Sequence, residues 1–273
     1  MTDKRPPVFL TIAAVTHEPL KALGGYIPQI QDSLRKLGYS GQLQESTLSH
    51  LENPLLVALP AGMKPAAVEN TYSVFTADTR SAFTFNDQGI FAYHTTAYTT
   101  RAALFKQVRM GLEIFHQHVQ LQTLRRVGAR MLDLIRPSDS GHTVASYVAP
   151  SFRGFEAISA TEGWATGLST FEQRFSDGDA EVIAKFDCLP DGFGLRADIM
   201  STMQGHALPP HLTSVPGVLH AILDIDSGTR ASIEPRAFSI DAVMDELGGH
   251  KDRISRLFRA SVTPLALSEW GLQ

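Results

Sequence analysis

The sequence predicts an α+β fold in which antiparallel β-sheets are covered by amphipathic helices. Predicted strands come in groups instead of alternating with helices. Two strand pairs are separated by short turn segments, at 86–89 and 177–179. Apolar residues recur at helical spacing in only a few stretches. With 273 residues, 43% of them hydrophobic, the chain can bury a core, which excludes disordered and collagen-like proteins.

The first half is predicted to run from a strand through a β-rich region into a long helix. Thr99 or Thr100 is expected to cap that helix, and Gly111 inside it indicates close packing. We expect strands at 8–15, 72–76, 81–85, 90–98 and 121–135, and helices at 27–37, ending at Gly38, and at 104–119.

The second half repeats this pattern after a loop-like connection at 137–155, rich in Pro, Ser and Gly. We expect one hairpin from 170–176 and 181–188, a second from 218–226 and 229–235 across Ser227-Gly228, and a Ser239-capped helix to about 262, interrupted at Gly248-Gly249. The predicted organisation is therefore an N-terminal half at 1–136, the connection, and a C-terminal half at 156–273. The hairpin and helix at 81–119 and those at 218–260 leave open a diverged structural repeat.

Charge is low and unevenly distributed. Charged residues make up 19% of the chain, below the roughly 25% of typical domains. Residues 1–136 hold 14 Lys and Arg against 10 Asp and Glu, and residues 137–273 hold 10 against 18. The low charge content is better explained by a surface of uncharged polar residues than by one covered by a partner. The asymmetry between the halves can mark a nucleic-acid or partner surface.

A cytoplasmic location is expected. The single cysteine, Cys188, cannot form a disulfide within the chain and is expected to be a small core residue. The apolar run at 8–15 lacks a following small-residue cleavage site, which favours a buried strand over a signal peptide. No apolar run is long enough to predict a membrane span.

The most distinctive candidate site is an arginine cluster between residues 101 and 136. Arg126 and Arg130 share one face of the predicted strand, and Arg101 and Arg109 lie on the helix before it. Such a patch can contact phosphates, but interleaved aromatic residues are missing and the isoelectric point is only about 6.2. We therefore favour the reading that the arginines face acidic residues, in this chain or in a partner.

Catalytic and metal-binding signals are weaker. His220, Asp224 and Asp226 share one face of a predicted strand and are candidates for a metal or an unrecognised active site. A zinc site that uses His206, His211 and His220 is a weaker alternative. Because the alternate residues are apolar, the polar face is better explained as the solvent side of a half-buried strand. The glycines at 192–194 lack the helix of a dinucleotide site. We expect no cofactor.

Several blocks resemble a sporadically distributed bacterial family of conserved hypothetical proteins, about 250 residues long. They are Pro7-Val8 with Leu37-Gly38-Tyr39, residues 75–78 with 93–98, residues 126–133, and residues 223–226 with a C-terminal helix carrying Phe258. In the third block, Ala129, Met131 and Asp133 replace the usual Leu, Tyr and Asn. The family has no established activity. Its sporadic distribution implies mobile genes, such as defence or toxin–antitoxin-like systems.

These observations favour a non-catalytic binding or assembly protein, an accessory factor that contacts a protein partner or forms a homo-oligomer. One alternative is a nucleic-acid-contacting subunit that uses Arg101, Arg109, Arg126 and Arg130. The other is an enzyme with a site near His220, Asp224 and Asp226.

Overall fold

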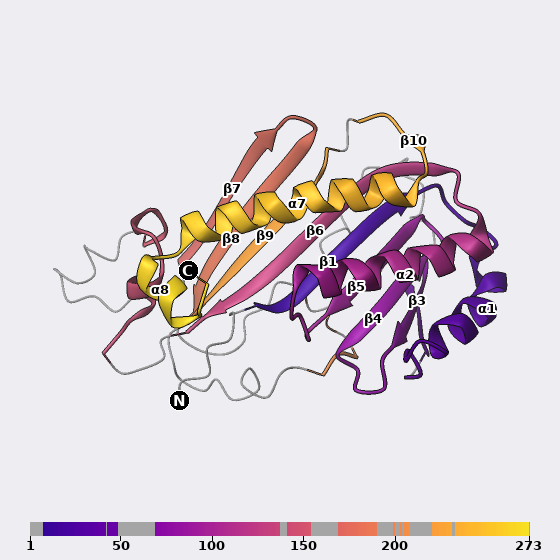
Figure 1. The fold of residues 1–273 in the computed structure, drawn as a ribbon, viewed down its shortest axis with the longest axis horizontal. Coiled ribbons are helices and arrows are strands. Elements are labelled where there is room, and N and C mark those ends of the chain that lie inside the picture. Colours follow the sequence, from indigo (N-terminus) through magenta and orange to yellow (C-terminus); the bar gives the residue numbers. More distant parts are fainter. Residues whose placement is uncertain are drawn as a thin grey trace, which may run out of the picture.

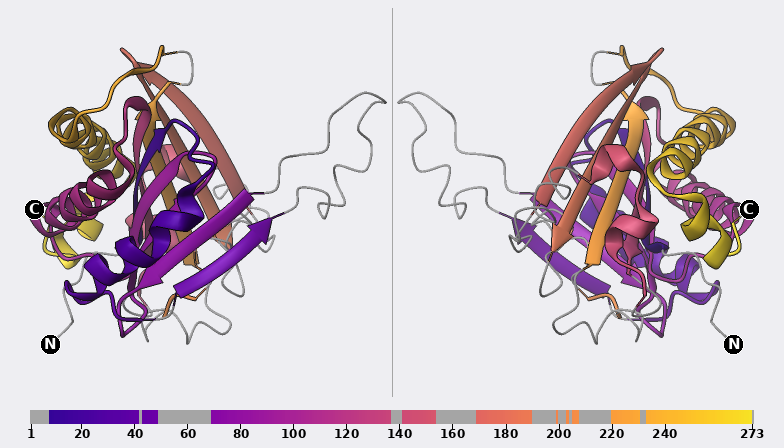
Figure 2. Two further views of the ribbon diagram at one scale, coloured as in Figure 1. Left: turned by 90° about the vertical axis from the view of Figure 1, so that its right-hand side faces the viewer. Right: turned by 90° about the vertical axis from the view of Figure 1, so that its left-hand side faces the viewer.

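One antiparallel sheet forms the centre of the molecule, with helices α1, α2 and α7 packed on one of its faces (Figures 1 and 2). The computed structural model describes residues 8–41, 43–48, 69–136, 141–153, 169–189, 199, 203, 205–207, 220–230 and 233–272. The predicted α+β class is confirmed. The described strands, however, belong to a single ten-stranded sheet, where the sequence predicted several sheets.

The strands follow the order β2-β3-β4-β5-β1-β6-β9-β8-β7, and the short β10 pairs with β6. Their bounds are β1 Val8–His17, β2 Leu43–Leu48, β3 Glu69–Phe75, β4 Ser81–Asn86, β5 Ile90–Thr95, β6 Thr123–Ile135, β7 Ser169–Asp177, β8 Ala180–Leu189, β9 His220–Thr229 and β10 Arg236–Ala237. The helices are α1 Leu23–Arg35, α2 Arg101–Val119, α3 Val144–Tyr147, the 3₁₀ turn η3 Pro150–Phe152, α7 Ile240–Ser261 and α8 Pro264–Glu269.

Two structural halves, β1 to α2 and β6 to α7, meet at the centre of this sheet, where β1 pairs with β6. The second structural half thus begins with β6, which lies inside the 1–136 half predicted from the sequence. On one side, β3, β4 and β5 follow each other and β5 returns to pair with β1. On the other side, β7, β8 and β9 follow each other and β9 returns to pair with β6. A long helix comes after each of these three-strand meanders, α2 after β5 and α7 after β9. The two halves therefore share one sheet and the same order of major elements.

Local signals placed most boundaries correctly. Thr100 caps α2 by accepting a hydrogen bond from the backbone of Ala103, and Ser239 caps α7 in the same way through Ala242. Gly38, just beyond α1, has a φ of +95°, a conformation that glycine adopts without strain. The hairpin loops between β4 and β5 and between β7 and β8 lie where they were expected.

Three local predictions were wrong. Ser227-Gly228 is not a hairpin turn: β9 continues through it to Thr229, because β6 and β8 pair with it on both sides. Gly248-Gly249 does not interrupt α7, which runs unbroken from Ile240 to Ser261. Leu37 is 49% exposed, since α1 ends at Arg35 before its apolar stripe reaches that residue.

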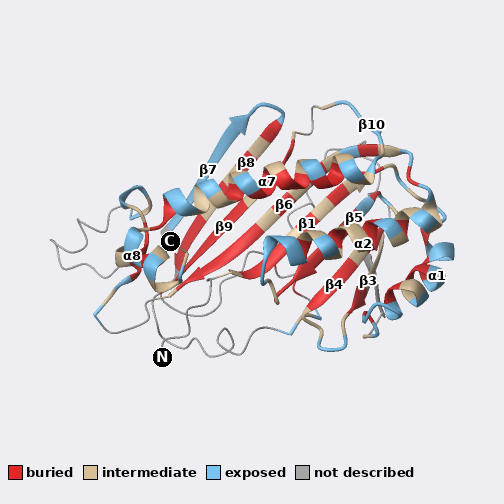
Figure 3. Cartoon of the chain, viewed as in Figure 1, coloured by how far each residue is buried: buried red, intermediate tan, exposed pale blue. Residues whose placement is uncertain are grey.

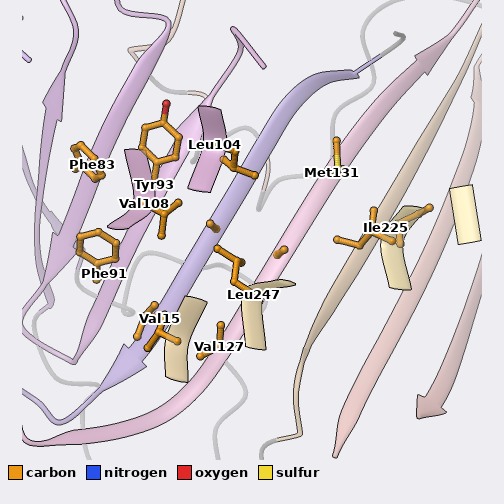
Figure 4. Packing of buried hydrophobic residues seen from close by; sticks show 14 of the residues in the cluster. Val15, Phe83, Phe91, Tyr93, Leu104, Val108, Val127, Met131, Ile225 and Leu247 are labelled. Atoms are coloured by element: carbon orange, nitrogen blue, oxygen red, sulfur yellow. The ribbon is translucent and has the colours of Figure 1, made fainter. Parts of the chain in front are cut away.

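The main core lies between the helices and the sheet. Figure 4 shows Val127 of β6 near Leu247 of α7, and Phe91 and Tyr93 of β5 near Val108 of α2. Met131 of β6 and Ile225 of β9 belong to the same cluster. A smaller apolar cluster lies on the other face of the sheet, where Ile199 and Met203 cover Leu132 and Ile222. Cys188 of β8 is buried, as predicted. The central strands are thus buried on both faces (Figure 3).

Candidate functional site

The two arginines of α2 bind carboxylates of α7. Arg101 Nη1 lies 2.5 Å from Asp252 Oδ1, and its Nη2 donates to the carbonyl of Gly248 at 3.2 Å. About two helical turns further along α2, Arg109 Nη2 lies 2.8 Å from Asp241 Oδ1. A Cβ at position 248 would come within 3.2 Å of Arg101 Nη2, so Gly248 allows this close approach. The pairs fasten the two long helices to each other.

Arg130 of β6 pairs with Asp224 of β9 on the opposite face of the sheet. Its Nε and Nη2 atoms lie 2.7 and 2.6 Å from the two carboxylate oxygens of Asp224. This two-pronged geometry is the strongest form of an arginine–carboxylate pair. Asp226, next on the same face, feels the charges of both Arg126 and Arg130, although burial dominates and raises the pKa of its carboxyl.

Gly228 makes room for the remaining arginine. A Cβ at this position would lie only 2.7 Å from Arg126 Nη2, so the guanidinium lies across the glycine. Gly128, directly opposite in the β6–β9 ladder, also has no side chain on this face. The charged group of Arg126 can therefore lie flat on the sheet beside Asp226.

The four predicted arginines do not form one patch. Side chains alternate along a strand, and Val127, Ala129 and Met131 of β6 pack in the core beneath the helices. Arg126 and Arg130 therefore face away from the helices, whereas Arg101 and Arg109 lie between α2 and α7. Three of the four pair with carboxylates of the acidic C-terminal half, at Asp224, Asp241 and Asp252. Nucleic-acid binding by these arginines stays a prediction.

His220, Asp224 and Asp226 do not lie on a solvent-facing strand, so that explanation of their pattern was wrong. β9 lies between β6 and β8, and His220 and Asp224 are buried. Asp224 is fully engaged by Arg130. The described part of the chain contains no group of three or more His, Cys, Asp or Glu side chains placed to hold a metal ion.

The edge that β7 forms in the described sheet was not predicted from the sequence. β7 is the last strand in the sheet order and, within the described chain, pairs only with β8. Residues 170–179 are all exposed, including Phe171 and Phe175, each 37% exposed (Figure 3). Glu172 and Arg174 stand between the two phenylalanines in the sequence, and Arg174 Nη2 lies 3.2 Å from Glu172 Oε1. The signal was present in the sequence as the symmetric run Phe171-Glu172-Gln173-Arg174-Phe175.

A histidine pair on the helix-free face was also missed. His94 of β5 lies within hydrogen-bond reach of His206 through its Nδ1 atom, and its Nε2 atom lies 2.6 Å from Thr84 Oγ1. Burial lowers the pKa of His94 to about 3 and that of His206 to about 4. Both imidazoles are therefore neutral, and the pair holds residues 205–207 against the sheet.

Comparison with known proteins adds no match: no family model, no curated protein and no solved structure is similar to the chain. The resemblance to the sporadically distributed bacterial family therefore stays a prediction. None of the described helices is both long and apolar enough to cross a membrane.

Proposed function

We propose that the chain is a non-catalytic binding and assembly protein that pairs with a second copy of itself through the free edge of β7. The observation that carries this proposal is the exposure of every residue from 170 to 179, in the last strand of the described sheet order. An edge strand presents unpaired backbone N–H and C=O groups to any strand that can align with it. Natural proteins usually blunt such edges, and here aromatic residues are exposed instead.

Two copies of β7 are complementary to each other when they are aligned antiparallel. Its nine residues, Ser169–Asp177, are centred on Gln173. Pairing two copies over their full length places Gln173 opposite Gln173, Glu172 opposite Arg174, and Phe171 opposite Phe175. Each charged or aromatic pair occurs twice because the interface is two-fold symmetric. Cross-strand pairs of these types each stabilise an antiparallel ladder by about 0.2–1 kcal/mol.

This register is specific. A shift by two residues would remove both Glu–Arg pairs and both Phe–Phe pairs, and a shift by one would place matching residues on opposite faces. A second copy of the chain therefore fits the edge better than an unrelated strand does. Because one strand pair is smaller than the standard protein interface of about 1,600 Å², we expect a dimer that dissociates on dilution.

The shared order of elements in the two halves supports a related proposal. β1, the meander β3-β4-β5 and α2 correspond in order to β6, the meander β7-β8-β9 and α7. We infer that the halves are a structural repeat joined by the β1–β6 pair. On this correspondence β7 matches β3, which is covered by β2.

The other functions receive less support. Three of the four arginines pair with carboxylates of this chain, which weakens the nucleic-acid alternative. The engagement of Asp224 by Arg130 weakens the enzyme alternative near His220. An accessory role in a bacterial defence or toxin–antitoxin-like system remains an expectation drawn from the resemblance alone, and the cytoplasmic location remains one drawn from the single cysteine and the polar, small-residue-poor segment after the first apolar run.

Charge reversal tests the proposal in solution. Sedimentation or light scattering of the wild-type chain should give a monomer–dimer equilibrium. Glu172→Arg should weaken dimerisation at least tenfold, because it places Arg opposite Arg twice. The double variant Glu172→Arg/Arg174→Glu should restore the dimer, because each charge again faces its opposite. A wild-type chain that stays monomeric at millimolar concentration, or a dimer indifferent to Glu172→Arg, would overturn the proposal.

A further inference from the structure

A cavity of about 250 Å³ lies between β6 and α7. It is on the side of the sheet that the helices cover, and no residue of β7 lines it. Its lining combines apolar side chains with a few polar ones, as small-molecule sites do. The residues that matter to the argument are Val8, Tyr98, Met131, Asp133, Lys251 and Ser255. Neither the arginine clusters nor the β7 edge contributes to it.

A buried carboxyl group and a buried amino group line this cavity. Asp133 is only 1% exposed and Lys251 only 7% exposed. Among the described residues, Asp133 Oδ1 has no hydrogen-bond partner. Lys251 Nζ lies 2.6 Å from Met131 Sδ, a weak acceptor, and 5.4 Å from the centre of the Tyr98 ring. The site therefore holds a strong acceptor and a strong donor that the chain satisfies poorly.

Burial makes this arrangement costly. It raises the pKa of the Asp133 carboxyl to about 7, against the opposing effect of Lys251, and it lowers the pKa of the Lys251 ammonium. A buried polar group without a hydrogen-bond partner destabilises a fold. A bound molecule that supplies both partners would remove this penalty.

We propose that this cavity binds a small carboxamide with an apolar body, whose N–H group donates to Asp133 and whose carbonyl accepts from Lys251. An amide presents a donor next to an acceptor and so matches the acceptor–donor pair of the cavity. It also brings no net charge into a buried site, unlike an amine or a carboxylate. Tyr98 and Met131 would contact the apolar body.

Benzamide and acetophenone form a matched pair of probes, because acetophenone has a methyl group in place of the amide nitrogen. In an NMR titration of the full chain, benzamide should give saturable shifts at residues around the cavity. Acetophenone should bind at least tenfold more weakly. Equal affinity for the two probes, or no saturable shift with benzamide, would overturn the proposal.

Variants of the cavity test the same claim in a folded protein. Lys251→Met and Asp133→Asn should each weaken benzamide binding at least tenfold. If either variant fails to fold, Ser255 provides an independent test, because it lines the cavity without belonging to the charged pair. Ser255→Met should fill the space and abolish binding, whereas Ser255→Ala should keep it. Undiminished binding in Ser255→Met would show that benzamide binds elsewhere and would contradict the proposal.

Discussion

Arg130 and Asp224 form a two-pronged ion pair across two neighbouring strands, on the face of the sheet away from the helices. Their side chains are 16% and 4% exposed. Leu132 lies directly opposite Asp224 in the ladder, so the pair is diagonal and borders the smaller apolar cluster. The guanidinium and the carboxylate neutralise each other, and either charge would be costly to bury alone.

Removing one partner of this pair should destabilise the protein more than removing both. An unpaired buried charge costs about 3–5 kcal/mol, and the partial exposure of Arg130 reduces this to about 2–3 kcal/mol for Asp224→Leu. The double variant Arg130→Met/Asp224→Leu should lie within about 1 kcal/mol of the wild type. Urea unfolding measures all three free energies. Additive effects of Arg130→Met and Asp224→Leu would mean that the two groups do not stabilise each other.

Gly111 of α2 should tolerate no side chain. A Cβ there would lie 2.1 Å from Cε1 of Phe83, a fully buried ring of β4. Gly111→Ala should therefore destabilise the protein by about 1–3 kcal/mol through overpacking, although alanine favours helix by about 1 kcal/mol. Gly25→Ala in α1 is the matched control, because no atom lies within 4 Å of its added Cβ. Thermal unfolding should show a lower Tm for the first variant and an unchanged or higher Tm for the second.

Acid should destabilise the fold partly through His94. Its pKa is about 3 in the folded protein because of burial, against 6.5 for an ordinary histidine. Between these values the unfolded chain binds more protons than the folded chain does, so stability falls as pH falls. From pH 7 to 4.5 this amounts to about 2 kcal/mol. His94→Gln should lose less stability over this interval than the wild type, as measured by urea midpoints at both pH values. Parallel losses in the two proteins would mean that His94 is protonated without cost.

Local structure was largely predictable from the sequence, because its signals are local. The hydroxyls of Thr100 and Ser239 stand where helix caps are needed, and the turn at 177–179 separates two strands. Ser227-Gly228 resembles a turn equally well, but long-range pairing with β6 and β8 overrides it. Gly248 resembles a helix stop, yet it gives Arg101 access to α7. Distant partners decide such cases.

The candidate site was less predictable, because it depends on which elements become neighbours. The sequence indicated that the arginines face the acidic half of the chain, and their pairing with Asp241, Asp252 and Asp224 agrees. It did not reveal that α2 and β6 present their arginines on different sides of the sheet. Nor could the spacing of Phe171 and Phe175 reveal that β7 is an edge strand, since this follows from the strand order alone.

The most direct test of self-pairing through β7 is a disulfide cross-link at its centre. In the proposed register Gln173 lies opposite its own copy, at the short distance that a disulfide requires. Cys188, the only native cysteine, is buried. Oxidised Gln173→Cys should therefore run as a covalent dimer on a non-reducing gel, whereas Ser176→Cys, which faces Thr170 of the second copy, should stay monomeric. Equal cross-linking of the two variants, or none in Gln173→Cys, would contradict the account.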